Sequence, residues 1–359
     1  MRVLIVHPSF YMYGGAELVI VRLSQYLTRH NVKVDILTSS MIYSVRRELR
    51  KSKDVRVIIP KSALVGDPFV ELSDWIKSYY PEYDIINFHN HPAEIMLYPE
   101  KHKSVWNCNE PPLQLLYGAK PSAEYLEKVR TIDIVVVSDE MNRDRFLKLY
   151  GEDHDVRIVH YGVDYDYFSS GEKRKLPNLE DKFVVLHVGT VHDMKNQARS
   201  IEAIHRLRDK IPNIHLVLAG YITEPYIDKV KGLIDSLNLQ DRVWITGSLP
   251  RDKLRDLYYS ADVLLHPIKT QGGWLAPFEA LSANLLPIVS PEAPCSSTLK
   301  KHNAGVVTRD YEDVIYKYYR DPDSFRDIVR NGHAFTREYM TWDRFGSEML
   351  RIFRELNEK

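Results

Sequence analysis

Short apolar runs rich in β-branched residues alternate with longer amphipathic segments along nearly the whole chain. Strands that alternate with helices in this way form parallel sheets joined by right-handed crossovers. The runs predicted to be strands in the first half are 3–6, 32–37, 55–59, 85–88, 104–106, 134–137 and 157–159. Those in the second half are 184–188, 215–219, 243–245, 263–265, 287–289 and 305–307. The sequence therefore predicts an α/β fold.

The length of 359 residues fits two domains, on a prior of roughly 150 residues each. The polar segment 169–181 contains Gly171 and Pro177 and separates the two sets of strands, which is typical of a linker. Beyond about Asp321 the pattern is wholly helical, so this tail must pack onto one of the domains. We predict a first domain over residues 1–170, a second over 171–335 and a final helix over 336–359.

Composition excludes several classes of protein. The 49 basic and 49 acidic residues balance, so no net field favours nucleic acid. Cys108 and Cys295 lie far apart in sequence, which argues against a disulfide framework or a zinc site. The first apolar run is too short for a signal peptide. No stretch approaches the roughly 18 apolar residues of a membrane span, so we expect a cytoplasmic protein.

Two glycine-containing turns join a strand directly to a helix, one towards each end of the chain. Strand 263–265 is followed by the glycine pair 272–273 and then by a helix, and strand 3–6 leads through Gly-Gly-Ala-Glu at 14–17 into another. Such a turn brings bare backbone N–H groups together with the positive end of a helix, an arrangement that favours a diphosphate. The two turns suggest a nucleotide-linked ligand held by two α/β domains.

Three places in the sequence, each at or just after a strand end, have side chains or amides suited to such a ligand. The backbone N–H groups of Gly273, Trp274 and Leu275 are the predicted diphosphate cradle. Lys195 follows a strand-end glycine turn and precedes a helix. The helix dipole disfavours a cation at this end, but a bound phosphate would make a lysine favourable there. His89 ends a strand at the carboxyl edge, which is the ligand edge of open α/β sheets, although a single histidine is more often structural.

Other two-domain α/β proteins fit less well. A dehydrogenase would have G-x-G-x-x-G after its first strand, and the turn at 14–17 does not match this pattern. A periplasmic binding protein would require a signal peptide, which we do not expect here. The sequence Asp164-Tyr165-Asp166 matches a metal-binding D-x-D, but it follows the last strand of the first domain and precedes the linker, so we expect no metal there.

Five segments occur in a characteristic order, at 14–17, 84–89, 159–168, 189–195 and 271–279. They read G-G-A-E, D-I-I-N-F-H, V-H-Y-G-V-D-Y-D-Y-F, G-T-V-H-D-M-K and Q-G-G-W-L-A-P-F-E. Together they resemble the motifs of the retaining glycosyltransferases of family 4. The resemblance implies a GT-B fold, with two facing Rossmann-like domains, parallel sheets and a C-terminal helix that crosses back to the first domain. It also implies transfer of a hexose from a UDP- or GDP-linked sugar to a glycan or glycolipid, with no metal and no further cofactor.

The resemblance assigns roles to individual residues. It implies that His89 lies near the transferred sugar and that Gly14 and Gly15 border it. Lys195 would bind the diphosphate and Glu279 the ribose hydroxyls, whereas an acidic residue near a helix N-terminus is the structural alternative for Glu279. The remaining predicted donor contacts are Gly247 and Ser248, in a turn that borders the base in the family.

Three positions depart from the family pattern. Thr190 replaces the arginine that would pair with Lys195, which removes a bidentate phosphate contact. Gln271 replaces the first glutamate of the Glu-x7-Glu element and keeps its hydrogen bonds without its charge. Trp274 stands where the family has glycine, and would crowd the loop or stack on the donor sugar. Both Thr190 and Gln271 are still predicted to contact the donor.

The sequence indicates fewer residues for binding the acceptor than for binding the donor. Asn109 and Glu110 follow a strand end in the first domain and are predicted to contact the acceptor. Arg46, Arg47 and Arg50 belong to a basic run that is either a solvated face or a contact with anionic membrane.

Two other functions remain open from the sequence alone. A family member with a decayed active site, acting as a nucleotide-sugar-binding or scaffold protein, is favoured by Thr190 and Gln271. A sugar-nucleotide epimerase of the same two-domain architecture is the second, because fold alone does not fix function.

Overall fold

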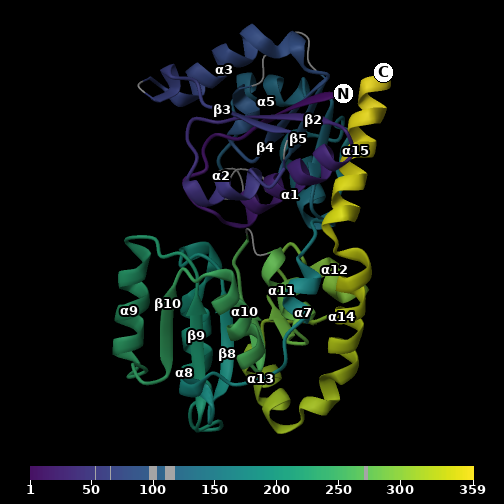
Figure 1. Ribbon diagram of the computed structural model, residues 1–359. Coiled ribbons are helices and arrows are strands. Elements are labelled where there is room, and N and C mark those ends of the chain that lie inside the picture. The colour runs from purple at the N-terminus through teal and green to yellow at the C-terminus, as the bar shows by residue number, and fades with distance from the viewer. Residues whose placement is uncertain (53, 65, 97–102, 110–117, 271–273) are drawn as a thin grey trace. The chain divides into compact units, whose positions relative to one another are not determined.

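The computed structural model describes residues 1–359 except 53, 65, 97–102, 110–117 and 271–273. The chain forms two compact units (Figure 1). The first unit comprises Met1–Gly162 and Trp342–Lys359, and the second comprises Val163–Thr341. Residues 163–170 and 336–341 therefore belong to the second unit, a few residues away from the predicted boundaries.

The first unit contains a parallel seven-stranded sheet in the order β3-β2-β1-β4-β5-β6-β7. Its strands are β1 (Arg2–Val6), β2 (Lys33–Leu37), β3 (Val55–Ile58), β4 (Ile85–His89), β5 (Ser104–Asn107), β6 (Ile134–Val137) and β7 (Val156–Ile158). Its α-helices are α1 (Gly15–Arg29), α2 (Tyr43–Leu49), α3 (Pro68–Tyr79), α5 (Ala123–Arg130), α6 (Glu140–Tyr150) and α15 (Trp342–Glu358). Short 3₁₀ turns are η1 (Ser62–Leu64), η2 (Tyr80–Glu82) and η3 (Ala93–Met96).

The second unit contains a parallel six-stranded sheet in the order β10-β9-β8-β11-β12-β13. Its strands are β8 (Phe183–Val188), β9 (Ile214–Ala219), β10 (Val243–Gly247), β11 (Val263–His266), β12 (Leu286–Val289) and β13 (Val306–Val307). Its α-helices are α7 (Tyr165–Ser169), α8 (Gln197–Leu207), α9 (Tyr226–Ser236), α10 (Arg251–Ser260), α11 (Leu275–Ser282), α12 (Ser296–Lys301), α13 (Tyr311–Arg320) and α14 (Arg326–Tyr339). Short 3₁₀ turns are η4 (Pro177–Leu179), η5 (Asp193–Lys195) and η6 (Pro322–Phe325).

Both sheets have the doubly wound order of a Rossmann-like domain, which confirms the predicted fold class. The strand order reverses between β1 and β4 in the first unit and between β8 and β11 in the second. In open parallel sheets, ligands bind outside the carboxyl ends of the strands at such a reversal. Residues at the ends of these four strands are therefore the first to consider as site residues.

The polar segment 169–181 packs against α10 of the second unit. The Gly171 N–H donates to the Tyr259 hydroxyl at 2.8 Å, and the Leu176 N–H donates to the Ser260 hydroxyl at 3.1 Å. A Cβ at Gly171 would lie 2.3 Å from the Tyr259 ring, so the chain passes directly over that side chain.

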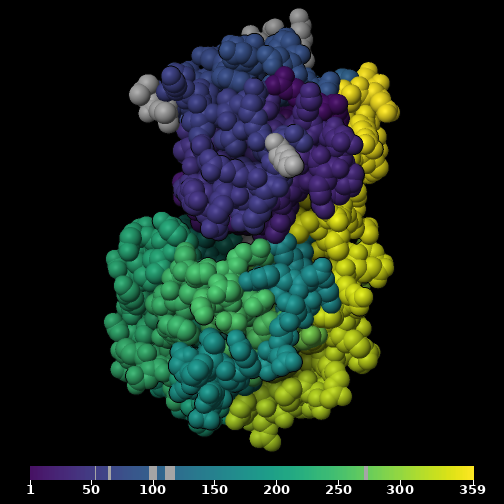
Figure 2. All heavy atoms as spheres, in the orientation of Figure 1, coloured from purple at the N-terminus to yellow at the C-terminus, as the bar shows by residue number. Residues whose placement is uncertain are grey.

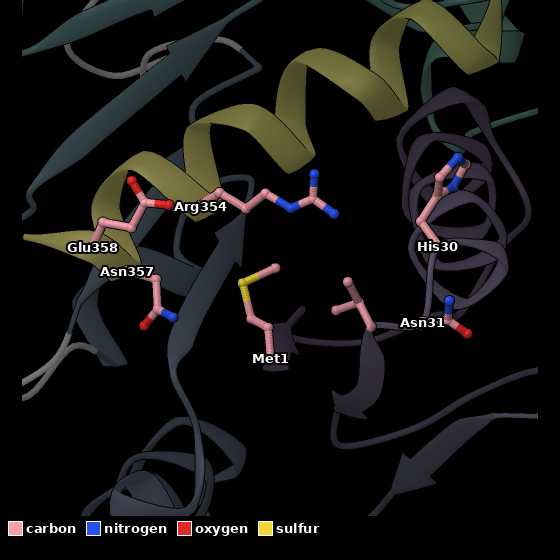
Figure 3. A pocket seen from close by; sticks show the side chains of 7 residues that line it. Met1, His30, Asn31, Arg354, Asn357 and Glu358 are labelled. Atoms are coloured by element: carbon pink, nitrogen blue, oxygen red, sulfur yellow. The ribbon is translucent and has the colours of Figure 1, made fainter.

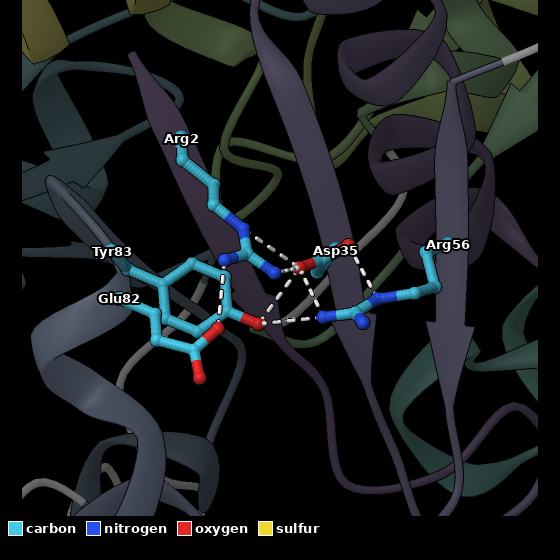
Figure 4. A network of polar contacts seen from close by, with 5 residues as sticks. All are labelled: Arg2, Asp35, Arg56, Glu82 and Tyr83. Carbon is cyan, nitrogen blue, oxygen red and sulfur yellow. Dashed lines mark hydrogen bonds and ion pairs between the residues drawn. The ribbon is translucent and has the colours of Figure 1, made fainter.

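A polar network joins the first three strands of the first sheet near their amino ends (Figure 4). Asp35 on β2 accepts hydrogen bonds from Arg2, Arg56 and Tyr83, at 2.8, 2.8 and 2.7 Å. Burial opposes ionisation of Asp35, but these hydrogen bonds outweigh it and hold the Asp35 pKa below its ordinary value. The network lies toward the amino ends of the strands, so it stabilises the sheet without occupying the ligand edge.

The C-terminal helix α15 packs on α1 of the first unit (Figures 1 and 2). Gly346 makes this close approach possible, because a Cβ there would lie 2.1 Å from Cγ of Tyr26. Arg157 contacts Glu355 at 2.6 Å, which joins β7 to the same helix. The predicted return of the C-terminal helix to the first domain is therefore present.

This close approach predicts a position-specific effect of adding one methyl group. Gly346→Ala should lower the free energy of unfolding by about 1–3 kcal/mol, because the new Cβ overlaps Tyr26. The matched control is Gly232→Ala on α9, where a Cβ meets nothing within 4 Å. Gly232→Ala should raise the free energy of unfolding by up to about 1 kcal/mol, because alanine has a higher helix propensity than glycine. Urea unfolding of both variants measures this, and equal effects of the two substitutions would contradict the packing.

Candidate active site

The turn after β8 is shaped by two glycines of the second unit. Gly189 and Gly220 both have φ of 155°, a region that side chains rarely adopt. A Cβ on Gly220 would lie 2.0 Å from the Gly189 carbonyl oxygen, so only glycine allows the ends of β8 and β9 to meet. The Lys195 side chain lies along this turn, with its Cγ 3.6 Å from the position of a Cβ on Gly189. The lysine predicted to bind phosphate therefore borders the carboxyl edge of the sheet.

Thr190 lies in the same turn and is half-buried. Its carbonyl accepts a hydrogen bond from the Gln197 side chain at 3.0 Å, which fixes the turn to the start of α8. Gly247 ends the neighbouring strand β10 with φ of 69°, and its carbonyl accepts from the Gly220 N–H at 3.0 Å. Ser248 follows it. The structure thus brings the predicted residues Thr190, Lys195, Gly247 and Ser248 to one edge of one sheet.

Helix α11 supplies the other predicted donor residues. Leu275 is its first residue, and Trp274 precedes it as a buried side chain whose ring lies 5.2 Å from that of Phe278. Trp274 was predicted either to crowd the loop or to stack on the donor sugar. In the structure its ring packs against Phe278 of α11. Gln271 and Gly273 lie outside the described residues.

Glu279 lies one turn into α11 and is held by Tyr258. The Tyr258 hydroxyl donates to Oε2 of Glu279 at 2.8 Å, and the Tyr258 side chain is fully buried on α10. Burial raises the pKa of Glu279, and burial together with Glu279 raises the pKa of Tyr258. Tyr258 thus engages one of the two carboxylate oxygens of Glu279. Sequence reasoning missed Tyr258, because only the fold brings α10 against α11.

The Asp164-Tyr165-Asp166 sequence has a structural role. Asp164 forms an ion pair with Arg251, and the Arg251 guanidinium lies 4.7 Å from the centre of the Tyr167 ring. Among the residues that the structure describes, no group of three or more His, Cys, Asp or Glu side chains is placed to hold a metal ion.

In the first unit, Gly14 and Gly15 lie where β1 leads into α1. The Gly14 N–H donates to the Glu17 carboxylate at 2.8 Å, and the other carboxylate oxygen lies 3.7 Å from Nε2 of His7. Nδ1 of His7 lies 3.3 Å from the carbonyl oxygen of His89. The His7 and Glu17 side chains are buried, so this chain of contacts fixes the glycine turn relative to the end of β4.

His89 is fully buried, and its neighbours determine its protonation. Its Nε2 lies 2.8 Å from Oδ1 of Asn87, and the Asn87 amide nitrogen donates to the Val105 carbonyl at 3.0 Å. Because a carbonyl only accepts, the hydrogen-bond network assigns the Asn87 oxygen to face His89, and Nε2 of His89 carries the proton. Burial, with a smaller contribution from His7, lowers the pKa of His89 to about 3. His89 is therefore neutral, and its Nδ1 has no hydrogen-bond partner among the described residues.

Asn87 was not identified from the sequence, although a signal existed. It lies two residues before His89 on the same strand, and residues two apart point to the same face of a sheet.

On the predicted acceptor side, Asn109 is engaged within the protein. Its side chain is hydrogen-bonded to Asn90 and Tyr161, and its carbonyl accepts from Asn142 at 3.1 Å. These contacts order the loops after β4 and β5. Glu110 lies outside the described residues.

Close by, a histidine–carboxylate pair follows β4. Nδ1 of the exposed His91 lies 2.5 Å from Glu94, a buried carboxylate that also accepts from the Tyr125 hydroxyl at 2.7 Å. This cluster was not predicted, because nothing in the local sequence links Tyr125 to the turn after β4.

The first unit also contains a cavity of about 380 Å³ at the opposite end of its sheet (Figure 3). It is lined by Met1, His30, Asn31, Val32, Arg354, Asn357 and Glu358. It includes none of the predicted site residues and lies at the amino ends of β1 and β2, away from the ligand edge.

Comparison with known proteins identifies the class. The fold is similar to that of the Anabaena protein HepE, solved in complex with UDP and glucose, with a TM-score of 0.81, 15% sequence identity and coverage of 99% of this chain and 100% of that chain. It is also similar to sucrose-phosphate synthase from Thermosynechococcus elongatus, with a TM-score of 0.80, 17% identity and coverage of 99% and 98%. Both are proteins of the GT-B architecture, and the two Rossmann-like units described above share it.

The sequence comparisons identify the family. The family described as Glycosyltransferase Family 4 matches residues 13–167, and the one described as Glycosyl transferases group 1 matches residues 169–333. The chain belongs to glycosyltransferase family 4, as its motifs predicted.

Two curated relatives are an uncharacterized glycosyltransferase of Methanocaldococcus jannaschii and a mannosyltransferase of Mycolicibacterium smegmatis. The first is 23% identical over 254 residues, which are 64% of this chain and 62% of the relative. The second, named a GDP-mannose-dependent alpha-(1-6)-phosphatidylinositol monomannoside mannosyltransferase, is 26% identical over 148 residues, 40% of this chain and 38% of the relative. The chain thus spans less than two thirds of each of these relatives.

Two buried histidines predict how stability depends on pH. Burial, with a smaller effect of Lys195, lowers the pKa of His187 to about 3, as burial does for His89. Below about pH 6.5 the unfolded chain binds these protons and the folded chain does not, so stability falls with decreasing pH. The free energy of unfolding should fall by about 1.4 kcal/mol per pH unit for each histidine.

Urea unfolding between pH 7 and pH 5 tests this expectation on the wild type and on His187→Asn. The variant should have the shallower pH dependence, because it lacks one of the two groups. Comparing slopes cancels the packing cost of the substitution, and equal slopes would show that His187 does not take up a proton on unfolding.

Proposed function

We propose that this protein is a retaining glycosyltransferase that moves a hexose from a nucleotide diphosphate sugar to a glycan or glycolipid acceptor. The observation that carries the proposal is that Lys195 and Glu279 follow β8 and β11, the two strands that flank the reversal of strand order in the second sheet. A cation suits a diphosphate, and a carboxylate suits ribose hydroxyls. The relative named for GDP-mannose and the structural neighbour solved with UDP support a nucleotide-linked donor.

In this proposal the second unit binds the donor. Lys195 and the backbone N–H groups at the start of α11, at Trp274 and Leu275, stabilise the departing diphosphate. Tyr258 fixes Glu279 so that its other oxygen accepts from the ribose. Gly247 and Ser248 border the base. Because protein cations and amides balance the phosphate charge, the reaction would require no divalent metal ion and no further cofactor.

The first unit would position the transferred sugar. The neutral His89 ring offers Nδ1 as a hydrogen-bond acceptor, so a sugar hydroxyl would donate to it. As the bond from the anomeric carbon to the phosphate oxygen breaks, a bond to the acceptor oxygen forms on the same face. The acceptor's proton passes to the departing phosphate, which leaves configuration retained.

A thermal-shift panel of UDP, GDP and ADP and their sugar conjugates, without added metal, tests the donor proposal. One nucleotide should raise the melting temperature by several degrees, because a ligand at 100 times its Kd stabilises by about 2.7 kcal/mol. Lys195→Ala should remove the shift, and the control Lys229→Ala on the exposed face of α9 should keep it. No shift with any nucleotide would contradict the proposal.

The competing candidate is a nucleotide-sugar-binding family member without transferase activity, favoured by Thr190 and Gln271 in place of charged residues. It predicts the same thermal shift but neither sugar transfer nor slow hydrolysis of the donor. Hydrolysis of the shifting sugar nucleotide, followed by NMR of the first-formed anomer, separates the two candidates. Retained configuration supports the transferase, and an inverted anomer would contradict retention.

We further propose a peripheral contact of the first unit with anionic membrane, since lipid-linked acceptors lie there. No helix within the described residues has the length and apolar character needed to cross a bilayer. Helix α2 presents Arg46, Arg47 and, at its end, Arg50, beside Tyr43, which is 71% exposed.

Sedimentation with phosphatidylserine vesicles should deplete the protein, and neutral phosphatidylcholine vesicles should not. The triple variant R46Q, R47Q and R50Q should lose the difference, because each basic residue near such a surface contributes about 1 kcal/mol. Equal sedimentation with both vesicle types would remove this proposal.

A further inference from the structure

The loops after β8 and β11 are joined at the predicted phosphate site. The Lys269 N–H donates to the Met194 carbonyl at 3.0 Å, and the Asn196 side chain donates to the Pro267 carbonyl at 2.9 Å. β8 and β11 are neighbouring strands that flank the reversal of strand order. These contacts bring Lys269 from the β11 loop to η5, the turn that contains Lys195.

The Lys269 ammonium group forms an ion pair with both carboxylate oxygens of Asp193. Its Nζ lies 2.8 and 2.7 Å from the two carboxylate oxygens, and the two side chains are 41% and 51% exposed. An ion pair exposed to this extent contributes little to stability. Stability alone therefore gives little reason to place this pair at the ligand edge.

The local charges favour an incoming anion. In the segment 189–195, Lys195 is the single lysine or arginine and Asp193 the single acidic residue, so the turn has no net charge without Lys269. Lys195 lies just before α8, whose positive end disfavours cations and favours phosphate. The Lys269 N–H contacts Met194 in the turn that leads to this helix end. Thr190, in the same turn, adds no charge.

We propose that Lys269 is a second cation of the donor diphosphate site. Its ammonium group pairs with Asp193 in the absence of ligand, and the diphosphate displaces the Asp193 carboxylate when it binds. This inference rests on the proposed function, because it assumes that the site binds a nucleoside diphosphate. It assigns the two partners of one ion pair opposite roles. Lys269 contributes to phosphate binding, and Asp193 competes with it.

A purely structural ion pair has a different signature. If the pair only stabilises the loop, then removing either partner disturbs the loop in the same way and changes affinity in the same direction. If the inference holds, removing the lysine weakens binding and removing the carboxylate strengthens it. The signs of the two effects therefore separate the two accounts.

The test is calorimetric titration of Lys269→Met and Asp193→Asn with UDP and with uridine, or with the nucleotide and nucleoside that the wild type binds. Lys269→Met should weaken diphosphate binding roughly tenfold, the lower end of what hydrogen bonds to charged groups contribute. Asp193→Asn should strengthen it about threefold, because an exposed ion pair is weak and its loss leaves the Lys269 ammonium group to the diphosphate. Nucleoside affinity should change in neither variant.

The matched control is the ion pair between Lys317 and Asp313 on α13, whose charged groups lie 2.8 Å apart and whose side chains are 65% and 59% exposed. Lys317→Met and Asp313→Asn should leave both affinities unchanged. Lys269→Gln is a second variant in case the methionine reduces solubility, and an unchanged melting temperature verifies folding.

A loss of diphosphate affinity in both Lys269→Met and Asp193→Asn, or no change in either, would overturn the inference about Lys269. The proposed function would still stand in that case, provided that the wild type binds a nucleoside diphosphate. If the wild type itself binds none of UDP, GDP and ADP, then the proposed function fails together with the inference.

Discussion

The contact between Gly189 and Gly220 is the constraint on which the candidate donor site depends. Any side chain at Gly220 would collide with the Gly189 carbonyl, so the ends of β8 and β9 can approach this closely only because residue 220 is glycine. This approach shapes the turn that leads into α8 and leaves Lys195 lying along it. The site is thus built by backbone geometry first, and its charged side chains depend on that geometry.

The charged residues of the site are held by partners that come from other elements. Tyr258 on α10 holds one oxygen of Glu279 on α11, and Asp193 in η5 holds Lys269 from the loop after β11. In the first unit, Asn87 fixes the tautomer of His89 because β5 supplies a carbonyl that can only accept. Positioning of this kind reduces the freedom that binding would otherwise have to remove.

The sequence predicted much of the fold because its signals are local. Strand 263–265 was predicted where β11 runs from Val263 to His266, since a short apolar run between turns has few alternatives in an alternating pattern. Lys195 and Glu279 were also visible, because their motifs lie within one turn and one helix. The segment 169–181 has the composition of a linker, yet it packs on Tyr259 and Ser260 of α10, and composition alone does not contain such long-range contacts.

The same limit applied to the positioning residues, since Tyr258, Asn87 and Lys269 acquire their roles from tertiary contacts. Hydrogen–deuterium exchange of the whole chain with and without UDP, GDP or ADP tests the proposed donor site most directly. We expect slower exchange in residues 189–197, 247–251 and 274–282, where the turns and helix starts of the proposed donor site lie. Slower exchange confined to the cavity lined by Met1, Asn31 and Arg354, or in none of these segments, would contradict it.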